Sequence, residues 1–455
     1  MEKKHGLDLT EGRISTLMLR FAWPFIISSV LVSLYGAVDL FVVGRYTNSA
    51  AISGVSSGTQ IMNIVVATAI GLSTAGTVIL GRCIGEKNEE AASRGVGTFL
   101  AFSIGVAFFM FAIVMLLQNQ IIALMKVPPE SVIYAKQYVF YCGFAVVPHI
   151  MYFSLGAIFR GMGNSMVPSI LSAVSCGMNI VLDFVFVAGF GWGVIGAAVA
   201  TAISQVMGFV VGLFIFLRIK LPFPLTKKDI RIDKESLRFI IKVGSPIGLQ
   251  ELLVNMSFMI ITTIMNSMGV IVSASAGVVS RVFNTTLLIP TSFGAAVAAM
   301  TAQNLGAGKR DRALKSLRWG IIYPLIFAVI FCVYAQLWPG SLTGLFSKDP
   351  EVIANGAMYL RSYVLDSLLV SFVFVMNSYF SGSGKSLVSM IHSLVATFGV
   401  RIPFSYFLSR MEGVTMFQLG FSAPAASLLS LIVCFIYLFW QEKKYKEQNL
   451  VNATV

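Results

Sequence analysis

The sequence predicts an all-α polytopic membrane protein, with twelve transmembrane helices in two six-helix lobes related by a pseudo-two-fold axis along the membrane normal. Composition, apolar segments of membrane-spanning length and an internal repeat predict this fold class. Of the 455 residues, 56% are hydrophobic and only 12% are charged, whereas soluble domains carry about twice that share of charge. No polar stretch of roughly 100 residues interrupts the chain, so we expect no attached soluble domain of ordinary size.

Twelve segments of about 20 or more mainly apolar residues are each long enough to cross a ~30 Å hydrocarbon core. The first follows a polar stretch, residues 1–13, and is too long for the apolar region of a signal peptide, so we interpret it as a membrane span. The predicted spans are residues 15–43, 51–80, 94–117, 131–157, 166–188, 193–217, 237–266, 271–300, 315–338, 352–380, 386–409 and 416–440.

The distribution of Lys and Arg predicts how these spans are oriented. An even number of spans places both termini on one side, and most of the 33 Lys and Arg residues fall in the turns on that side. Basic residues concentrate on cytoplasmic faces, so we expect a multi-pass protein of the plasma (inner) membrane with both termini in the cytoplasm. Because this charge is spread over every such turn, the net charge of +13 indicates no nucleic-acid-binding patch.

The chain repeats itself at an offset of 221 residues. The segment GMGNS at 161–165 corresponds to GSGKS at 382–386, and Gly85 corresponds to Gly306. A repeat of six spans keeps its orientation, which predicts an N-lobe (1–218), a cytoplasmic linker (219–236) and a C-lobe (237–455) with a central cleft between the lobes. Transporters built from repeats of this kind usually bind substrate at the interface between the repeats. GSGKS is not a phosphate-binding loop, because Tyr379 stands where that motif needs glycine, so we expect no nucleotide.

Polar residues at membrane depth in the first half predict a cation site. Asp39 and Asp183 lie deep in apolar spans, and the first half offers no basic residue at that depth. An intramembrane carboxylate costs at least ~2.5 to 3.5 kcal/mol on insertion scales, so it calls for a partner. Asn179 shares a helix face with Asp183, and Thr201 is expected at the same depth. These oxygen ligands suit an alkali cation or protons; the alternative is that both acids are satisfied structural groups.

The second half holds both signs of charge at membrane depth. We expect its acids and arginines to form a polar network, serving as structural or gating ion pairs, or else contributing to substrate binding or a second ion site. The residues of this possible C-lobe network are Glu251, Arg281, Arg361, Asp366 and Arg401.

Residue types that carry most enzyme chemistry are sparse. The five cysteines are scattered singly, and the three histidines match no metal-binding motif. No nucleophile elbow or channel filter motif stands out. We therefore expect neither an enzyme nor a bound cofactor, and no metal beyond Na⁺ at the cation site.

Several segments together resemble the multidrug and toxic compound extrusion (MATE) family over essentially the full length. They are VDLFVVGR at 38–45, LGRCIGEKNEEA at 80–91 with its copy QNLGAGKRDRAL at 303–314, FRGMGNS at 159–165 and NIVLD at 179–183. The resemblance implies an N-lobe cation site at Asp39, Asn179, Asp183 and Thr201, and a conformational hinge at Pro24. Glu251 and Asp366 lie about one turn from the C-lobe cation ligands of some members, so that role is not transferred.

The resemblance implies a secondary-active multidrug efflux antiporter that exports organic, cationic compounds against influx of Na⁺ or H⁺. The alternative is a lipid or lipid-linked oligosaccharide flippase of the same superfamily, which would favour a basic cleft. The expected partners are small organic substrates and membrane lipid, with no nucleic acid, and we expect a monomer.

Overall fold

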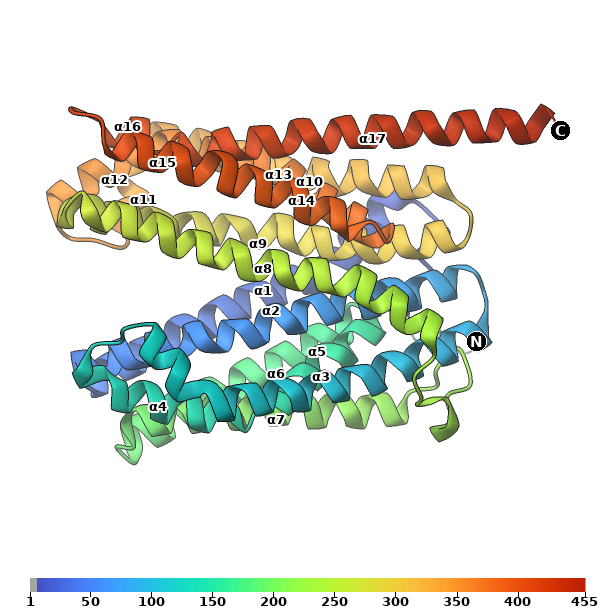
Figure 1. Cartoon of the computed structure of the whole chain (residues 1–455), viewed down its shortest axis with the longest axis horizontal. Helices are drawn as coiled ribbons and strands as arrows, with labels where there is room; N and C mark the ends of the chain where they lie inside the picture. Colours follow the sequence, from blue (N-terminus) through green and yellow to red (C-terminus); the bar gives the residue numbers. More distant parts are fainter. Residues whose placement is uncertain (1–5, 455) are drawn as a thin grey trace. The chain divides into compact units, whose positions relative to one another are not determined.

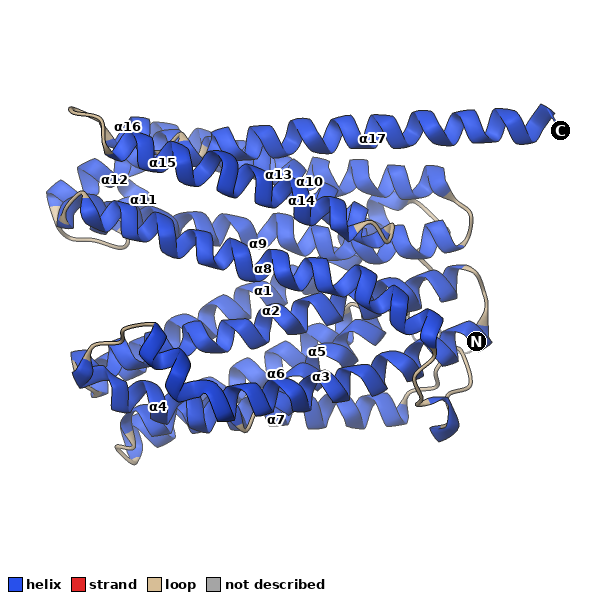
Figure 2. Cartoon of the chain, viewed as in Figure 1, coloured by secondary structure: helices blue, strands red, loops and turns tan. Residues whose placement is uncertain are grey.

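The computed structural model describes residues 6–454, and within that range the chain is helical with no strand (Figures 1 and 2). The α-helices of the first half are α1 (Ile14–Tyr46), α2 (Ser49–Gly85), α3 (Glu89–Leu124), α4 (Pro129–Gly143), α5 (Val146–Gly161), α6 (Met166–Asp183) and α7 (Gly193–Arg218). Those of the second half are α8 (Lys234–Ser267), α9 (Val270–Gly306), α10 (Arg310–Leu337), α11 (Pro339–Gly344), α12 (Pro350–Tyr363), α13 (Leu365–Gly382), α14 (Ser386–Ala396), α15 (Ile402–Ser409), α16 (Met416–Leu419) and α17 (Ser422–Thr454). Three short helical segments are η1 (Phe184–Gly189), η2 (Lys227–Asp229) and η3 (Thr397–Arg401).

The prediction of twelve membrane spans is confirmed. Within the described residues, 11 helices are long and apolar enough to cross a membrane, or 12 if α4 and α5 together form one span. These two helices meet at an angle of 51° where the sequence predicts one continuous helix. Pro148 explains the bend, because it has no N–H to continue the hydrogen-bond ladder at the start of α5. The equivalent helix of the second repeat is also broken, between α12 and α13.

The chain forms two compact units that do not coincide with the two repeats. Unit 1 comprises Met1–Leu252, Ala295–Ser316 and Ser381–Ser386, and unit 2 comprises Leu253–Gly294, Leu317–Phe380 and Leu387–Val455. Unit 1 therefore contains the first repeat together with three short pieces of the second. The lobe boundaries predicted from the repeat, 1–218 and 237–455, stay a prediction.

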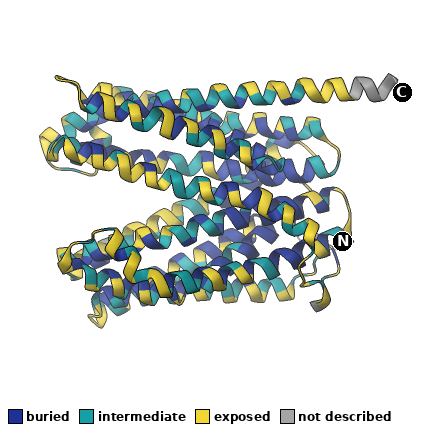
Figure 3. Ribbon diagram, in the orientation of Figure 1, coloured by how far each residue is buried: buried dark blue, intermediate teal, exposed yellow. Residues whose placement is uncertain are grey.

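Unit 1 is built around α2. This helix packs against α3, α4 and α5, and its buried side chains include Ile61, Val65 and Leu72. Buried and exposed residues alternate along most of the long helices (Figure 3). The exposed residues include large apolar side chains such as Phe41, Phe108 and Leu116, as a lipid-facing surface requires. Unit 2 has its own apolar core, which includes Val279, Phe283 and Leu360.

Side chains of α6 hold α1 in place by bonding its main-chain carbonyls. The Ser169 hydroxyl donates to the carbonyl of Pro24 at 2.6 Å, and the Cys176 thiol donates to the carbonyl of Leu31 at 3.1 Å. Pro24 lies inside α1, where it removes one backbone donor from the helix. The two helices are thus joined along the length that leads to the predicted cation site. The hinge role of Pro24 stays a prediction.

Candidate functional site

The structure brings the four predicted N-lobe residues onto three neighbouring helices of unit 1. Asp39 belongs to α1, Asn179 and Asp183 belong to α6, and Thr201 belongs to α7. Helix α6 packs against both α1 and α7, so it is the middle helix of the three. Asp183 is its last residue, and the π-helical segment η1 follows directly. Wider π-type turns inside helices are frequent at functional sites.

The two carboxylate side chains and the amide side chain of this group are buried. Asp183 is 0% exposed, Asn179 is 1% exposed and Asp39 is 8% exposed. The Asn179 amide donates a hydrogen bond to the Thr201 hydroxyl at 3.4 Å, which joins α6 to α7. Asp183 lies within electrostatic range of Asp39, so the two carboxylates act on one another. The sequence-predicted residues therefore form one cluster.

Buried oxygen atoms in this cluster have no hydrogen-bond partner among the described residues. They are Oδ1 of Asp39, Oδ1 of Asn179 and both carboxylate oxygens of Asp183. Buried polar atoms are normally hydrogen-bonded, and an exception calls for an explanation. Carboxylate and amide oxygens are ligands for hard cations, and a carboxylate also takes up a proton. The cluster has the donor set that a small cation requires.

Sequence reasoning missed three residues that surround Asp39. Tyr35, Tyr138 and Cys142 all lie within electrostatic range of its carboxylate. The Tyr35 hydroxyl also lies close to that of Thr201, so α1 and α7 approach one another there. Its position four residues before Asp39 places it on the same helix face, and this spacing was the available signal. Tyr138 and Cys142 share the same spacing on α4, but nothing in their sequence context links them to Asp39.

Two predicted members of the C-lobe network, Asp366 and Arg401, lie close to one another in unit 2. Asp366 is buried, and it lies within electrostatic range of Arg401. Arg401 donates to the Tyr363 hydroxyl at 2.7 Å, and its guanidinium lies 4.6 Å from the centre of the Phe258 ring. A cation over an aromatic face is stabilised by the ring quadrupole. Tyr363 and Phe258 are not among the residues predicted from the sequence.

The other predicted members of this network are Arg281, Arg361 and Glu251. The side chains of Arg281 and Arg361 are exposed, and their main-chain carbonyls accept hydrogen bonds from Thr285 and Gln336. Glu251 belongs to unit 1, whereas Asp366 and Arg401 belong to unit 2.

Within the residues that the structure describes, no group of three or more His, Cys, Asp or Glu side chains is placed to hold a metal ion.

Comparison with known proteins identifies the family. The sequence model of the MatE family matches the chain twice, over residues 24–185 and 246–407. This chain belongs to the MatE family. The two matches are of equal length and cover corresponding parts of the two repeats, which agrees with the duplication read from the sequence. As a MatE protein it is a membrane transporter and not an enzyme.

Relatives of this MatE transporter include proteins named for drug resistance or export. It is 28% identical to the probable multidrug resistance protein YoeA of Bacillus subtilis over 96% of each chain. It is 26% identical to the multidrug export protein MepA of Staphylococcus haemolyticus over 89% of each chain. The coarse prediction of a MATE-type transporter with multidrug-efflux relatives is confirmed.

Solved structures share its fold at lower sequence identity. A MATE protein crystallised in the straight conformation superposes with a TM-score of 0.91 at 20% identity, over 97% of this chain and 99% of that one. A transporter of the MOP superfamily from Pyrococcus furiosus gives the same score, also at 20% identity, over 97% of this chain and 98% of that one. At this identity the likeness shows the fold alone, and the fold is the two-lobe fold of MATE transporters.

Proposed function

We propose that this MatE transporter is a secondary-active multidrug efflux antiporter. It exports organic, cationic compounds and couples this export to the influx of Na⁺ or H⁺. The supporting observation is the cluster of buried oxygens at Asp39, Asn179 and Asp183 that lack hydrogen-bond partners among the described residues. The drug-export names of the relatives support the substrate class.

Coupling follows from linkage between the ion and the substrate. A ligand shifts a conformational equilibrium only by its differential affinity for the two states. In the proposed mechanism the ion at Asp39 and Asp183 favours one conformation, whereas the organic substrate favours another, so each weakens the binding of the other. A protein of this kind needs no nucleotide, because the ion gradient supplies the free energy.

We also propose the cellular setting that the basic residues support. Both termini lie in the cytoplasm, and the protein resides in the plasma (inner) membrane as a monomer. The polar linker and the turn between α2 and α3 then face the cytoplasm, as the concentration of Lys and Arg on that side favours.

Transport in reconstituted liposomes tests the proposal. A fluorescent organic cation such as ethidium is supplied, and inward Na⁺ and pH gradients are imposed separately. We expect one of the two gradients to drive dye movement, and Asp39→Asn or Asp183→Asn to reduce that movement by about tenfold or more. The matched control is Glu90→Gln, because that side chain is exposed in the first turn of α3. Gradient-driven transport at the wild-type rate in both Asp variants would refute the assignment.

Lipid or lipid-linked oligosaccharide export is a second candidate. The exposed side chains of Arg281 and Arg361 favour it, because anionic head groups are bound by guanidinium groups. Susceptibility to organic cations in cells that lack their main efflux pumps separates the two functions. An efflux antiporter raises resistance in such cells, whereas a flippase leaves it unchanged.

A further inference from the structure

The residues that precede α1 make a set of contacts that the proposed cation site does not use. Residues 6–12 lie at the face of unit 1 where the turn between α2 and α3 and residues 219–236 also lie, which we call the N-terminal face (Figure 1). The Leu7 N–H donates to the carbonyl of Gly163 at 3.0 Å, just beyond the end of α5. Leu9 is 0% exposed, although it lies in a segment with few other apolar residues.

The same segment is bonded to the end of α9. The Leu9 N–H donates to Oε1 of Gln303 at 3.3 Å, and the Asn304 amide donates to the Leu9 carbonyl at 3.0 Å. The N–H and the carbonyl of Leu9 are therefore each bonded by one of two consecutive side chains of the second repeat. Because Gln303 is 1% exposed and Asn304 is fully buried, solvent does not compete for these bonds.

The start of α10 adds further bonds to the segment. The Lys309 ammonium donates to the Thr10 carbonyl at 3.1 Å, and Nη1 of Arg312 donates to the Gly12 carbonyl at 3.0 Å. Arg312 also donates through Nε to Oδ1 of Asn304 at 3.2 Å, which orients the asparagine toward Leu9. Hydrogen bonds from charged donors are the stronger kind.

Gln303 connects both repeats through a single carboxamide. Its Oε1 accepts from Leu9, and its Nε2 donates to the carbonyl of Gly161 at 2.8 Å. Gly161 ends α5 in the first repeat, whereas Gln303 lies near the end of α9 in the second. Separation of these two helix ends must therefore break a bond of Gln303 or a bond of residues 6–12.

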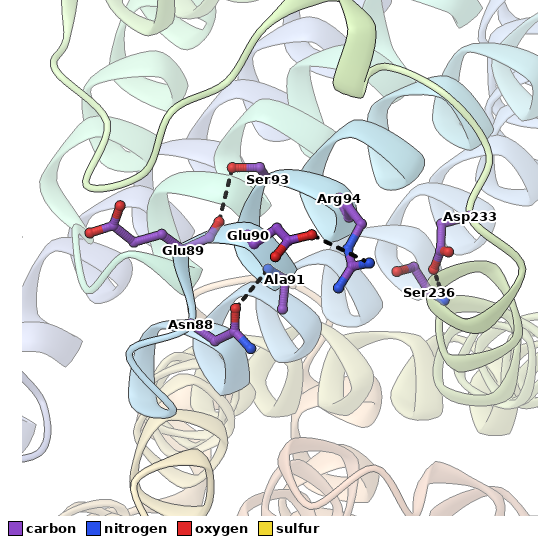
Figure 4. Close-up of polar contacts among 8 residues, drawn as sticks. All are labelled: Asn88, Glu89, Glu90, Ala91, Ser93, Arg94, Asp233 and Ser236. Carbon is purple, nitrogen blue, oxygen red and sulfur yellow. Dashed lines mark hydrogen bonds and ion pairs between the residues drawn. The ribbon is translucent and has the colours of Figure 1, made fainter.

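The linker, which leads into the second repeat, makes an equivalent contact with the first repeat. Thr98 on α3 donates through Oγ1 to the Arg231 carbonyl at 3.0 Å and accepts from the Asp233 N–H at 3.0 Å. Figure 4 shows Asp233 close to the beginning of α3, where it accepts from the Ser236 N–H. At the repeat offset, Thr10 corresponds to Arg231, and each carbonyl is bonded by the other repeat. Each segment that leads into a repeat is therefore bonded to the other repeat, at its third helix or at the turn before that helix.

We propose that residues 6–12 form a latch that stabilises the closed N-terminal face, and that Gln303 and Asn304 are the positioning residues that hold it. This inference rests on the proposed antiport, because alternating access requires that the face open in each cycle. Opening requires residues 6–12 to leave either α5 or the end of α9. The strength of the latch then sets the ratio of closed to open molecules, and through it the transport rate.

Hydrogen exchange of the full-length protein in lipid nanodiscs measures the latch directly. The amide hydrogens of Leu7 and Leu9 are both bonded in the closed state, so we expect slow exchange in the peptide that contains them. Gln303→Ala removes the acceptor for Leu9 and the donor to Gly161, so exchange there is expected to rise by about tenfold. The matched control, Gln336→Ala, removes a glutamine near the end of α10 and is expected to leave this exchange unchanged. Wild-type exchange in Gln303→Ala would overturn the proposal.

A milder variant covers the case in which Gln303→Ala does not fold. Lys309→Ala removes only the bond to the Thr10 carbonyl, and we expect faster exchange confined to the same peptide. Unchanged exchange in Lys309→Ala would contradict the latch. Wild-type exchange in a folded Gln303→Ala protein would contradict it as well.

A reversible cross-link tests whether the latch must open during transport. The paired substitutions Leu9→Cys and Asn304→Cys replace two residues that touch, and the five native cysteines stay in place because they are buried. We expect oxidation to stop dye transport and a reductant to restore it, while dye binding persists. Full transport by the oxidised protein would overturn the proposal. If the unmodified protein moves no dye, the proposed function fails, whereas the exchange experiment still decides the latch.

Discussion

Gly85 and Gly306 occupy equivalent positions in the two repeats, and each packs against the main chain of the other's helix within unit 1. A Cβ atom on Gly85 would lie 2.9 Å from the Ala307 nitrogen, and one on Gly306 would lie 3.0 Å from the Arg82 carbonyl carbon. A Cβ atom at either position would also overlap a carbonyl oxygen, that of Gln303 or that of Arg82, so neither fits without a shift of backbone. The ends of α2 and α9 therefore meet symmetrically at the N-terminal face.

The first prediction concerns this contact. Gly85→Ala or Gly306→Ala forces the two backbones apart, and such overpacking costs about 1 to 3 kcal/mol. We expect a lower thermal unfolding temperature for the purified protein in detergent. Gly105→Ala is the control, because a Cβ there meets nothing within 4 Å and alanine gains up to about 1 kcal/mol in a helix. A Gly85→Ala protein as stable as wild type would show that this contact does not limit stability.

The second prediction concerns Thr201, whose hydroxyl touches both Asn179 and Tyr35. Thr201→Val keeps the shape but removes the hydroxyl, so the two neighbours lose the group that orients them. We expect the coupling ion to bind about tenfold more weakly, as is typical when a partner of a ligand is lost. The ion concentration that gives half-maximal dye transport measures this change. Thr201→Ser keeps the hydroxyl and should behave like wild type; equal ion dependence in the valine and serine variants would contradict the assignment.

The third prediction concerns the guanidinium of Arg401. It bonds the Tyr363 hydroxyl and lies over the Phe258 ring, two contacts that a planar group makes together and an ammonium does not. We expect Arg401→Lys to destabilise the protein by about 1 to 2 kcal/mol. Thermal unfolding provides the measurement, with Arg361→Lys as control because that side chain is exposed. Equal stability of the two variants would mean that the planar contacts contribute nothing.

The fourth prediction concerns acid sensitivity of the linker. The Thr226 hydroxyl and N–H hold the pKa of Asp229 below its ordinary value, and the Ser236 N–H does the same for the pKa of Asp233. A lowered pKa in the folded state means that these bonds stabilise the linker above the ordinary pKa and are lost as pH falls through the folded value. The protection factors of residues 226–236, which are the exchange rates corrected for the intrinsic effect of pH on amide exchange, should therefore be constant near neutral pH and fall only below about pH 4.

Thr226→Val separates this effect from general acid unfolding. Without the hydroxyl, Asp229 loses its side-chain partner, so the fall in protection should begin at a higher pH than in wild type. An identical pH profile in the two proteins would contradict the assigned role of the Thr226 hydroxyl.

The sequence was most informative where the membrane imposes the constraint. Every stretch predicted to span is mainly helical in the structure, with short breaks in some spans, because a chain in hydrocarbon must satisfy its backbone internally. The bend between α4 and α5 was not predicted, although Pro148 was a visible signal. The break between α12 and α13 has no proline, and it became apparent only from the structure.

The candidate site could be predicted for residues whose presence in apolar helices is costly. Asp39 and Asp183 stand out because a carboxylate in hydrocarbon needs a partner, and Asn179 follows from its spacing. Tyr138 and Phe258 could not be identified in this way, since aromatic residues are ordinary in membrane helices, and Tyr35 was indicated only by its spacing from Asp39. The contacts of residues 6–12 with Gln303 and Asn304 depend on tertiary packing between parts of the chain nearly 300 residues apart, which no local pattern reveals.

Binding of a fluorescent organic cation to the purified protein in nanodiscs, titrated against the coupling ion, tests ion coupling at Asp39 and Asp183 most directly. The account predicts that rising ion concentration weakens dye binding in wild type, and that this dependence disappears in Asp39→Asn and Asp183→Asn while Glu90→Gln retains it. Dye affinity that depends on the ion as strongly in both Asp variants as in wild type would contradict it.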